Sequence, residues 1–302
     1  MSLAQQQSVA LARTQARLNT SARARRFVGR MLLYAIALVI AAFFMGPFLW
    51  TIASSLKTGV EIRSFPPSFW PATPHFENYI QVFRAVPFGL FLKNTIIVTV
   101  LAVFGQTASA TLVAYGFARF RFPFRATLFS IVLATLLLPR EVTWIPLFLL
   151  YKKLGWLDTL LPLIVPSFFG GGAFFIFLLR QFFLTLPRDL DEAAKMDGAN
   201  SLQVLFRVLV PLSKPAISTA AIFSFLNHWN EFQEPLIFLN NSKNFTIALG
   251  LRYFQTLPNE SQDPRDHLLM AASLIVLAPC LVIFFTAQRS FVKGIVMSGI
   301  KG

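Results

Sequence analysis

The chain has 302 residues, of which 55% are hydrophobic and 13% are charged, and its formal net charge is +14. Its 34 phenylalanines and positive mean hydropathy are a larger apolar load than one water-soluble domain of this length normally buries. The composition therefore excludes an ordinary soluble domain and predicts an integral membrane protein.

The first predicted element is a membrane-spanning helix at residues 31–56, a stretch of 26 residues without a charge. A helix rises about 1.5 Å per residue, so roughly 20 residues cross a hydrocarbon core of about 30 Å. The stretch is far longer than the core of about 7–15 apolar residues in a cleavable secretory signal, so we expect it to stay in the membrane. Residues 1–30, with six arginines, precede it as a basic cytoplasmic tail.

Residues 57–93 follow as the longest extracytoplasmic loop, where the prolines between 66 and 74 exclude a regular helix. The second span occupies 94–118, which is again uncharged, and the basic inner turn RFRFPFR follows it at 119–125. A third span is predicted within 126–151, as one helix that carries Arg140-Glu141 in its middle or outer part.

The fourth span occupies the uncharged residues 159–179 and contains three consecutive glycines, Gly170 to Gly172. Small residues let helix backbones approach closely in lipid, so close packing is one interpretation of these glycines. A flexible or broken point in a translocation pathway is the other.

A fifth span is predicted at 215–239, as one helix that contains Glu231 and Glu234, and a sixth at the uncharged residues 268–288. Six spans place the C-terminal tail, 291–302, on the same side as the N-terminus. With both ends inside, the cytoplasmic segments hold 17 basic and four acidic residues, an excess of 13, while the rest of the chain has an excess of one. This is the positive-inside asymmetry of membrane proteins, so the basic charge predicts an orientation and not nucleic-acid binding.

The inner stretch between the fourth and fifth spans is the most polar one and is predicted to form two short helices. Asp189, Asp191 and Glu192 complement the N-terminal dipole of the first helix, which should stop at Asp197-Gly198 because glycine accepts the left-handed conformation.

The second helix is predicted to be capped by Asn200 or Ser201 and ended by Pro211. Its apolar residues at i, i+3, i+4 and i+7 are Leu202, Leu205, Phe206 and Leu209. The stretch is interpreted either as a docking element for another protein or as a connector that lies on the membrane. A DNA-binding helix-turn-helix is disfavoured, because both ends are tied to the bilayer.

Residue patterns of enzyme sites are missing. The segment from Gly294 to Gly299 has the spacing of a P-loop, but Ile300 stands where the phosphate-binding lysine would be. We predict no catalytic residue and no metal site, and the single Cys280 excludes an intrachain disulfide. A membrane enzyme or a channel stays an alternative, because both could use the acidic residues and the histidine of the spans. Those residues are Glu141, His228, Glu231 and Glu234.

The segment EAAKMDGA at 192–199 resembles the EAA loop of ABC-importer permeases. The family's pattern maps onto Glu192, Ala193, Ala194, Asp197, Gly198, Ala199 and Pro211. This resemblance implies that residues 186–212 are a cytoplasmic coupling loop that docks on an ATPase subunit. Val210 stands where leucine is usual, and Phe206 is displaced by one position, which are mild departures.

Other segments resemble the carbohydrate branch of this family, in particular the G-type permease of maltose-type systems. They include FENY at 76–79, LPREVTWIPLFLL at 138–150 and WNEFQEPL at 229–236, and the resemblance spans about residues 50–302. It implies an all-α integral membrane protein with the type I ABC-importer permease fold. Five of its six transmembrane helices would form the core at 90–290.

The resemblance also implies a function, which is to move a carbohydrate across the cytoplasmic membrane of a bacterium or archaeon. The implied partners are a homologous second permease, two ATP-binding subunits that hold ATP and Mg, an extracytoplasmic sugar-binding protein and the lipid bilayer. No cofactor and no enzymatic activity are implied for this chain itself.

Four residues near the end of the fifth span are candidates for a translocation path: Asn227, Trp229, Asn230 and Glu231. Sugars are bound by amides and carboxylates together with stacking aromatic rings, and a charge at a helix centre costs about 2.5–3.5 kcal/mol unless it faces protein or water. The alternative is that these groups lie at the outer headgroup level, or that Arg140 pairs internally with Glu141 or Glu231.

Overall fold

A computed structural model describes the backbone of residues 3–255 and 265–299 and the side chains of 27–255 and 265–287. Within these residues the chain is helical and contains no strand, which confirms the predicted all-α class. The side chains of most of the N-terminal tail and of the C-terminal tail lie outside these ranges.

The longer helices are α1 (Leu3–Ser55), α4 (Phe88–Arg119), α5 (Arg125–Ala134), α6 (Arg140–Lys153), α8 (Ala173–Thr185), α12 (Lys214–Trp229) and α15 (Asp266–Gly299). The shorter α-helices are α2 (Gly59–Ile62), α3 (Asn78–Ala85), α7 (Leu161–Ile164), α9 (Asp189–Met196), α10 (Ser201–Gln203), α11 (Val210–Leu212), α13 (Gln233–Phe238) and α14 (Ile247–Leu251). Four 3-10 turns are η1 (Thr135–Leu137), η2 (Val165–Phe168), η4 (Ser242–Asn244) and η5 (Arg252–Phe254), and η3 (Val204–Leu209) is a π-helix.

Four helical stretches of the described chain have the length and apolar character of membrane spans. They are Phe27–Ser55, Phe88–Arg119, Leu161–Thr185 and Asp266–Ala287, and each overlaps one of the uncharged stretches of the sequence. The number rises to six if each of two bent helix pairs counts as one span.

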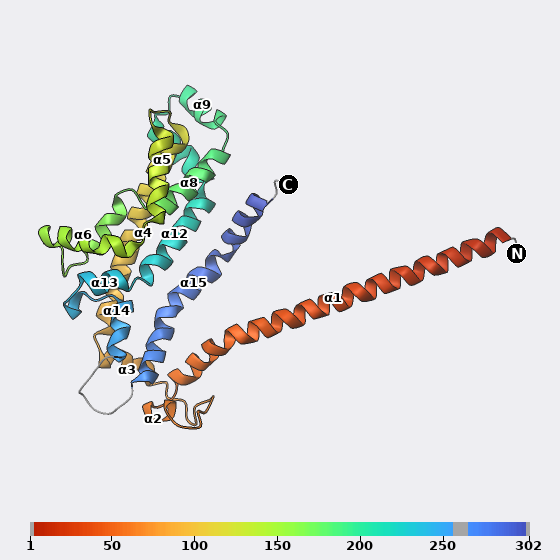
Figure 1. Ribbon diagram of the computed structural model, residues 1–302, viewed down its shortest axis with the longest axis horizontal. Helices are drawn as coiled ribbons and strands as arrows, with labels where there is room; N and C mark the ends of the chain where they lie inside the picture. The colour runs from red at the N-terminus through yellow and green to blue at the C-terminus, as the bar shows by residue number, and fades with distance from the viewer. Residues whose placement is uncertain (1–2, 256–264, 300–302) are drawn as a thin grey trace.

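The third predicted span is bent and not straight. The stretch that contains α5 and η1 meets α6 at an angle of 99°, and the break falls at Leu138-Pro139. Proline disfavours the helical conformation of the residue before it, and Leu138 has an extended ψ of 121°. The expectation of one continuous helix through Arg140 is therefore wrong, and α6 turns away from the direction of α5 (Figure 1).

The fifth predicted span is not one helix either, because α12 ends at Trp229 and α13 begins at Gln233. The carboxylate of Glu231 lies between them and accepts hydrogen bonds from the backbone N–H groups of Gln233 (3.0 Å) and Glu234 (3.2 Å). These N–H groups begin a new helix and have no acceptor within it, so the carboxylate satisfies them. The second bent pair instead joins Ser201–Leu212 to α12, at 83°.

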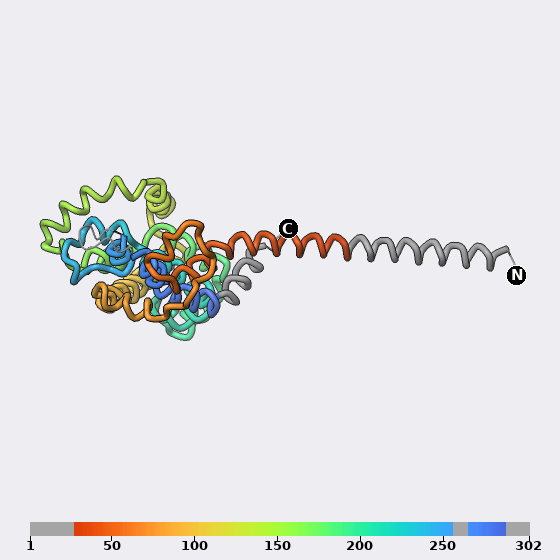
Figure 2. Tube along the Cα trace, turned by 90° about the horizontal axis from the view of Figure 1, so that it is seen from below, coloured from red at the N-terminus to blue at the C-terminus, as the bar shows by residue number. Residues whose placement is uncertain are grey.

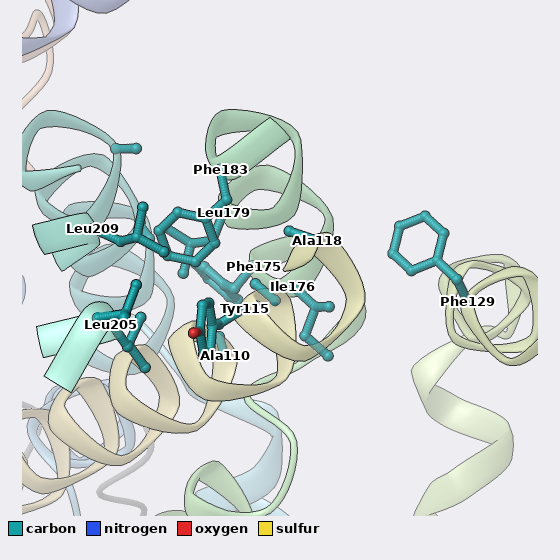
Figure 3. Close-up of a cluster of buried hydrophobic side chains, with 14 residues drawn as sticks. Ala110, Tyr115, Ala118, Phe129, Phe175, Ile176, Leu179, Phe183, Leu205 and Leu209 are labelled. Carbon is teal, nitrogen blue, oxygen red and sulfur yellow. The ribbon is translucent and has the colours of Figure 1, made fainter. Parts of the chain in front are cut away.

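Helix α4 is the centre of the bundle and packs against both α8 and α12. A buried cluster that includes Ala110, Leu179 and Leu205 joins α4, α8 and the stretch before α12 (Figure 3). We call this end of the bundle, which also carries α9, the α9 end, and the opposite end the α3 end (Figure 1).

Helix α1 leaves the bundle as a long separate rod (Figures 1 and 2). Its side chains from 27 to 45 are exposed, and the last part of the helix packs against α15 and is hydrogen-bonded to α3. A rod of apolar, exposed side chains fits a helix that is surrounded by lipid or by another membrane subunit.

The three glycines of the fourth span break the helix between η2 and α8. Gly170, Gly171 and Gly172 have φ values of +89°, +66° and +80°, a region that favours glycine. A Cβ atom added to Gly171 would lie 2.5 Å from the Cβ atom of Ala110 on α4. The helix is therefore both broken and closely packed at this point.

The segment after α13 folds back onto α4 at the α3 end. The side-chain amide of Asn94 donates to the carbonyl oxygens of Lys243 (2.8 Å) and Phe245 (3.0 Å), and the hydroxyl of Thr95 accepts the N–H of Ile247 (2.7 Å). Polar residues at the start of the uncharged second span thus satisfy the backbone of this loop.

Candidate functional site

Residues 186–212, which we call the polar loop, contain α9 as their first helix, and α9 ends where the sequence predicts. The N–H of Gly198 donates to the carbonyl oxygen of Lys195 (3.0 Å), and the N–H of Ala199 donates to that of Ala194 (2.9 Å). These two bonds and the φ of +84° at Gly198 form a Schellman motif, which satisfies the free carbonyl groups at a helix end.

The next helix begins with a capping box. The side chain of Asn200 accepts the N–H of Gln203 (2.9 Å), and the side chain of Gln203 accepts the N–H of Asn200 (2.8 Å). Of the two caps considered from the sequence, the structure therefore selects Asn200 over Ser201.

The end of this second helix differs from the prediction. Helical structure continues through Pro211 to Leu212, and residues 204–209 form a π-helix. The wider π turn changes which side chains share a face, so Leu205 and Leu209 are buried while Leu202 and Phe206 are exposed. The expected single apolar face of four residues is therefore wrong.

The two alanines that face inward hold α9 on the bundle. Ala194 and Ala199 pack against the buried cluster of the α9 end, whereas Glu192, Ala193, Asp197 and Gly198 are exposed. Met196, a residue that sequence reasoning did not single out, is 89% exposed. Together with the exposed Lys195, these residues leave this part of the loop open to another protein.

A buried ion pair ties α9 to α4. The Nε atom of Arg119 lies 3.1 Å from an Oδ atom of Asp191, and the two side chains are only 5% and 13% exposed. The terminal nitrogens of Arg119 also donate to the carbonyl oxygen of Leu186 (3.1 Å each). Sequence reasoning used Asp191 only as a charge for the helix dipole and did not find its partner.

A second contact ties the other helix of the loop to α4. The hydroxyl of Tyr115 donates to the carbonyl oxygen of Ser201 (3.0 Å), one turn of α4 before Arg119. Both helices of the loop are thus joined to the same end of α4 by polar contacts.

The charged groups near the bend of α6 pair internally. A terminal nitrogen of Arg140 lies 3.3 Å from a carboxylate oxygen of Glu231, as one of the alternatives for this region expected. The other carboxylate oxygen of Glu231 accepts the N–H groups at the start of α13, so both of its oxygens are engaged.

Trp229 is a packing residue. Its side chain is 3% exposed, its indole N–H donates to the carbonyl oxygen of Val276 on α15 (3.0 Å), and its ring stacks on Phe225. The buried ring shows no exposed face to a sugar in this structure, so the path role of Trp229 stays a prediction. Asn227 and Asn230 are exposed, and the Asn230 amide donates to the carbonyl oxygen of Leu226 (2.8 Å).

A further polar contact inside the bundle was missed by sequence reasoning. The side-chain oxygen of Gln106 on α4 accepts a hydrogen bond from Ser224 (2.5 Å) and lies 3.3 Å from a ring nitrogen of His228, both on α12. The available signal was the glutamine itself, which stands in the middle of an uncharged span. A polar group in the middle of a membrane span needs hydrogen-bond partners. Here these partners link α4 to α12.

The comparisons with known proteins agree with this architecture. Residues 108–296 match the family described as "Binding-protein-dependent transport system inner membrane component". The match covers more than half of the chain and includes the polar loop, and the chain therefore belongs to this family.

Curated relatives of similar length support the assignment. The chain is 31% identical to the sulfoquinovosyl glycerol transport system permease protein SmoH of Agrobacterium fabrum, over 91% of this chain and 95% of the relative. It is 30% identical to the arabinooligosaccharides transport system permease protein AraQ of Halalkalibacterium halodurans (89% and 94%). It is 34% identical to the sn-glycerol-3-phosphate transport system permease protein UgpE of Rhizobium meliloti (89% and 95%).

A solved structure confirms the fold. A chain in the crystal structure of a bacterial ABC transporter involved in the import of the acidic polysaccharide alginate superposes with a TM-score of 0.78 at 24% identity, over 88% of this chain and 97% of that chain. The fold is that of a type I ABC-importer permease, as the sequence resemblance implied.

Proposed function

We propose that this chain is one permease subunit of an ATP-driven importer that moves a carbohydrate across the cytoplasmic membrane. Two of the three relatives described above are named for a sulfoquinovosyl or an arabinose-containing substrate, which favours a carbohydrate over other cargo. An extracytoplasmic sugar-binding protein delivers the substrate, and a homologous second permease completes the pathway.

The exposed segment of the polar loop is the observation that carries this proposal. Glu192, Ala193, Met196, Asp197 and Gly198 are exposed on a capped helix that is fixed to α4 by a buried ion pair. A partner that moves such a helix also moves α4, because a rigid element transmits displacement. Two ATP-binding subunits are that partner and hold ATP and Mg, while this chain performs no catalysis.

The orientation follows from the charge distribution. The excess of basic residues lies in the segments around the α9 end and in both tails, and positive segments stay in the cytoplasm. The α9 end and both termini are therefore proposed to be cytoplasmic, and the α3 end faces the binding protein. Asn227, Asn230 and Glu231 stay candidates for the translocation path.

Glu192→Lys tests the docking role in the transporter that contains this chain, co-expressed with its ATP-binding subunits. We expect the variant to reach the membrane but to lose co-purifying ATPase and substrate uptake, because it reverses an exposed charge in the proposed contact. Glu77→Lys makes the same charge change at the exposed α3 end and should retain the ATPase. If Glu192→Lys retains both ATPase and uptake, this segment is not the docking element.

A further inference from the structure

Two arginines at the α9 end, Arg125 and Arg180, belong to none of the ion pairs found among the described residues. Arg125 begins α5, and the guanidinium of Arg180 on α8 lies 4.1 Å above the ring of Phe129, one turn further along α5. Residues four positions apart lie on the same face of a helix, so Arg125 stands on the side of α5 that Arg180 covers. In the described part of the chain, the recorded ion pairs involve other arginines, at positions 63, 119 and 140.

The hydrogen-bonding capacity of this pair is only partly used. One terminal nitrogen of Arg125 donates to the carbonyl oxygen of Phe120 (3.0 Å). The Nε of Arg180 is buried and has no hydrogen-bond partner among the described residues. A buried, unpartnered donor on a guanidinium costs free energy, and a negatively charged acceptor would remove this cost.

The surroundings of the pair have the residue pattern of the headgroup level of a bilayer. The turn between α4 and α5 joins two segments with membrane-span character and alternates arginine with phenylalanine. Phe124 is 76% exposed and is held in the left-handed region with φ +59°, and Phe122 is 37% exposed. Leu128 and Ile131 continue this exposed apolar surface along α5. Aromatic side chains beside basic ones are typical of the headgroup level of a bilayer.

We propose that Arg125 and Arg180 bind the phosphate of an anionic phospholipid, whose acyl chains lie along the exposed face of α5. Guanidinium groups match phosphate oxygens with two parallel hydrogen bonds, and Arg121 on the same turn is exposed and adds a third positive charge. Basic pockets between membrane helices at the cytoplasmic side bind such headgroups in other proteins. The site is separate from the docking segment of α9 and does not depend on the transported substrate.

Native mass spectrometry of the intact transporter complex tests the site. The complex is titrated with phosphatidylglycerol, phosphatidylcholine or inorganic phosphate, and the bound adducts are counted. For the wild type we expect at least one phosphatidylglycerol to bind about tenfold more tightly than phosphatidylcholine, which is the scale of one charge-assisted hydrogen bond. Equal retention of inorganic phosphate and phosphatidylglycerol would overturn the lipid assignment in favour of a small-anion site.

Two variants and a control locate the site. Arg125→Gln/Arg180→Gln should lose the preference for phosphatidylglycerol, whereas Arg207→Gln, which removes an exposed charge at the same end, should keep it. Because the double variant could fold poorly, Arg180→Lys is measured beside it, and it should keep the preference with reduced affinity, since lysine retains the charge but not the planar fork. A double variant that is folded and binds phosphatidylglycerol like the wild type would contradict the proposal.

Discussion

Arg119, the last residue of α4, and Asp191, in the first turn of α9, form an ion pair with 3.1 Å between Nε and an Oδ atom, and both side chains are buried. Asp191 occupies the position directly before the Glu-Ala-Ala segment, so the pair joins the proposed docking helix to the central helix of the bundle. If α9 is the docking helix, we expect a displacement of α9 by another subunit to act on α4.

Asp191→Ala should uncouple the two helices. It leaves the buried charge of Arg119 without a partner, and the loss of one member of a buried pair costs about 3 kcal/mol. We expect a lower thermal unfolding temperature of the complex and less substrate transported per ATP hydrolysed. Asp189→Ala removes an exposed carboxylate from the same helix and serves as the control. If Asp191→Ala transports as much substrate per ATP hydrolysed as the wild type, the ion pair does not transmit movement.

Gly198 should tolerate asparagine better than valine. A Cβ atom there would meet nothing within 4 Å, so the cost of a substitution comes from the φ of +84° alone. This cost is about 1–2 kcal/mol for a residue with a side chain, and asparagine adopts the conformation most readily. Uptake should therefore fall in the order wild type, Gly198→Asn, Gly198→Val. Equal uptake by both variants would mean that the turn geometry is not required.

Gly171→Ala should destabilise the protein more than Gly170→Ala. Both positions have positive φ, but only at Gly171 would the added Cβ meet neighbouring atoms, at 2.5 Å from the backbone nitrogen and Cβ of Ala110. Overpacking of this kind costs about 1–3 kcal/mol, in addition to the cost of the positive φ that both variants share. Thermal unfolding of the two purified variants measures the difference, and equal values would refute the close contact with α4.

Asn230→Ala and Trp229→Phe should have different consequences. Trp229→Phe loses the hydrogen bond to Val276, which contributes about 1 kcal/mol, so stability should fall while substrate affinity stays constant. Asn230→Ala should reduce uptake, with retained stimulation of ATPase activity by the binding protein, if Asn230 lies on the path. Unchanged uptake in Asn230→Ala would remove it from the path.

The proposed orientation predicts which positions react with a membrane-impermeant thiol reagent. With Cys280 replaced by alanine, Ser64→Cys at the α3 end should react in intact cells, because Ser64 is exposed. Met196→Cys should react only after permeabilisation, in cells without the ATP-binding subunits. Reaction of Met196→Cys in intact cells would reverse the orientation and exclude the docking role.

The sequence by itself determined the elements whose physics is local. Four spans are visible because an uncharged stretch of about 20 residues has a strong preference for the membrane. The end of α9 at Gly198 and the cap at Asn200 follow from hydrogen bonds between residues that are three to five positions apart. The break at Leu138-Pro139 is also local, and the sequence contained its signal in Pro139.

Only the tertiary structure decided which polar groups meet. Arg119 with Asp191, Arg140 with Glu231, and Gln106 with Ser224 each join different helices. Such contacts depend on the rotation and distance of packed helices, which a single sequence does not encode in any short pattern. The same reason explains why the sequence did not reveal the burial of Trp229. A tryptophan beside amides and a carboxylate fits a sugar site, but its ring is covered by α15. Local hydrogen bonding and membrane partition are properties of a segment, whereas the surroundings of a side chain are a property of the whole fold.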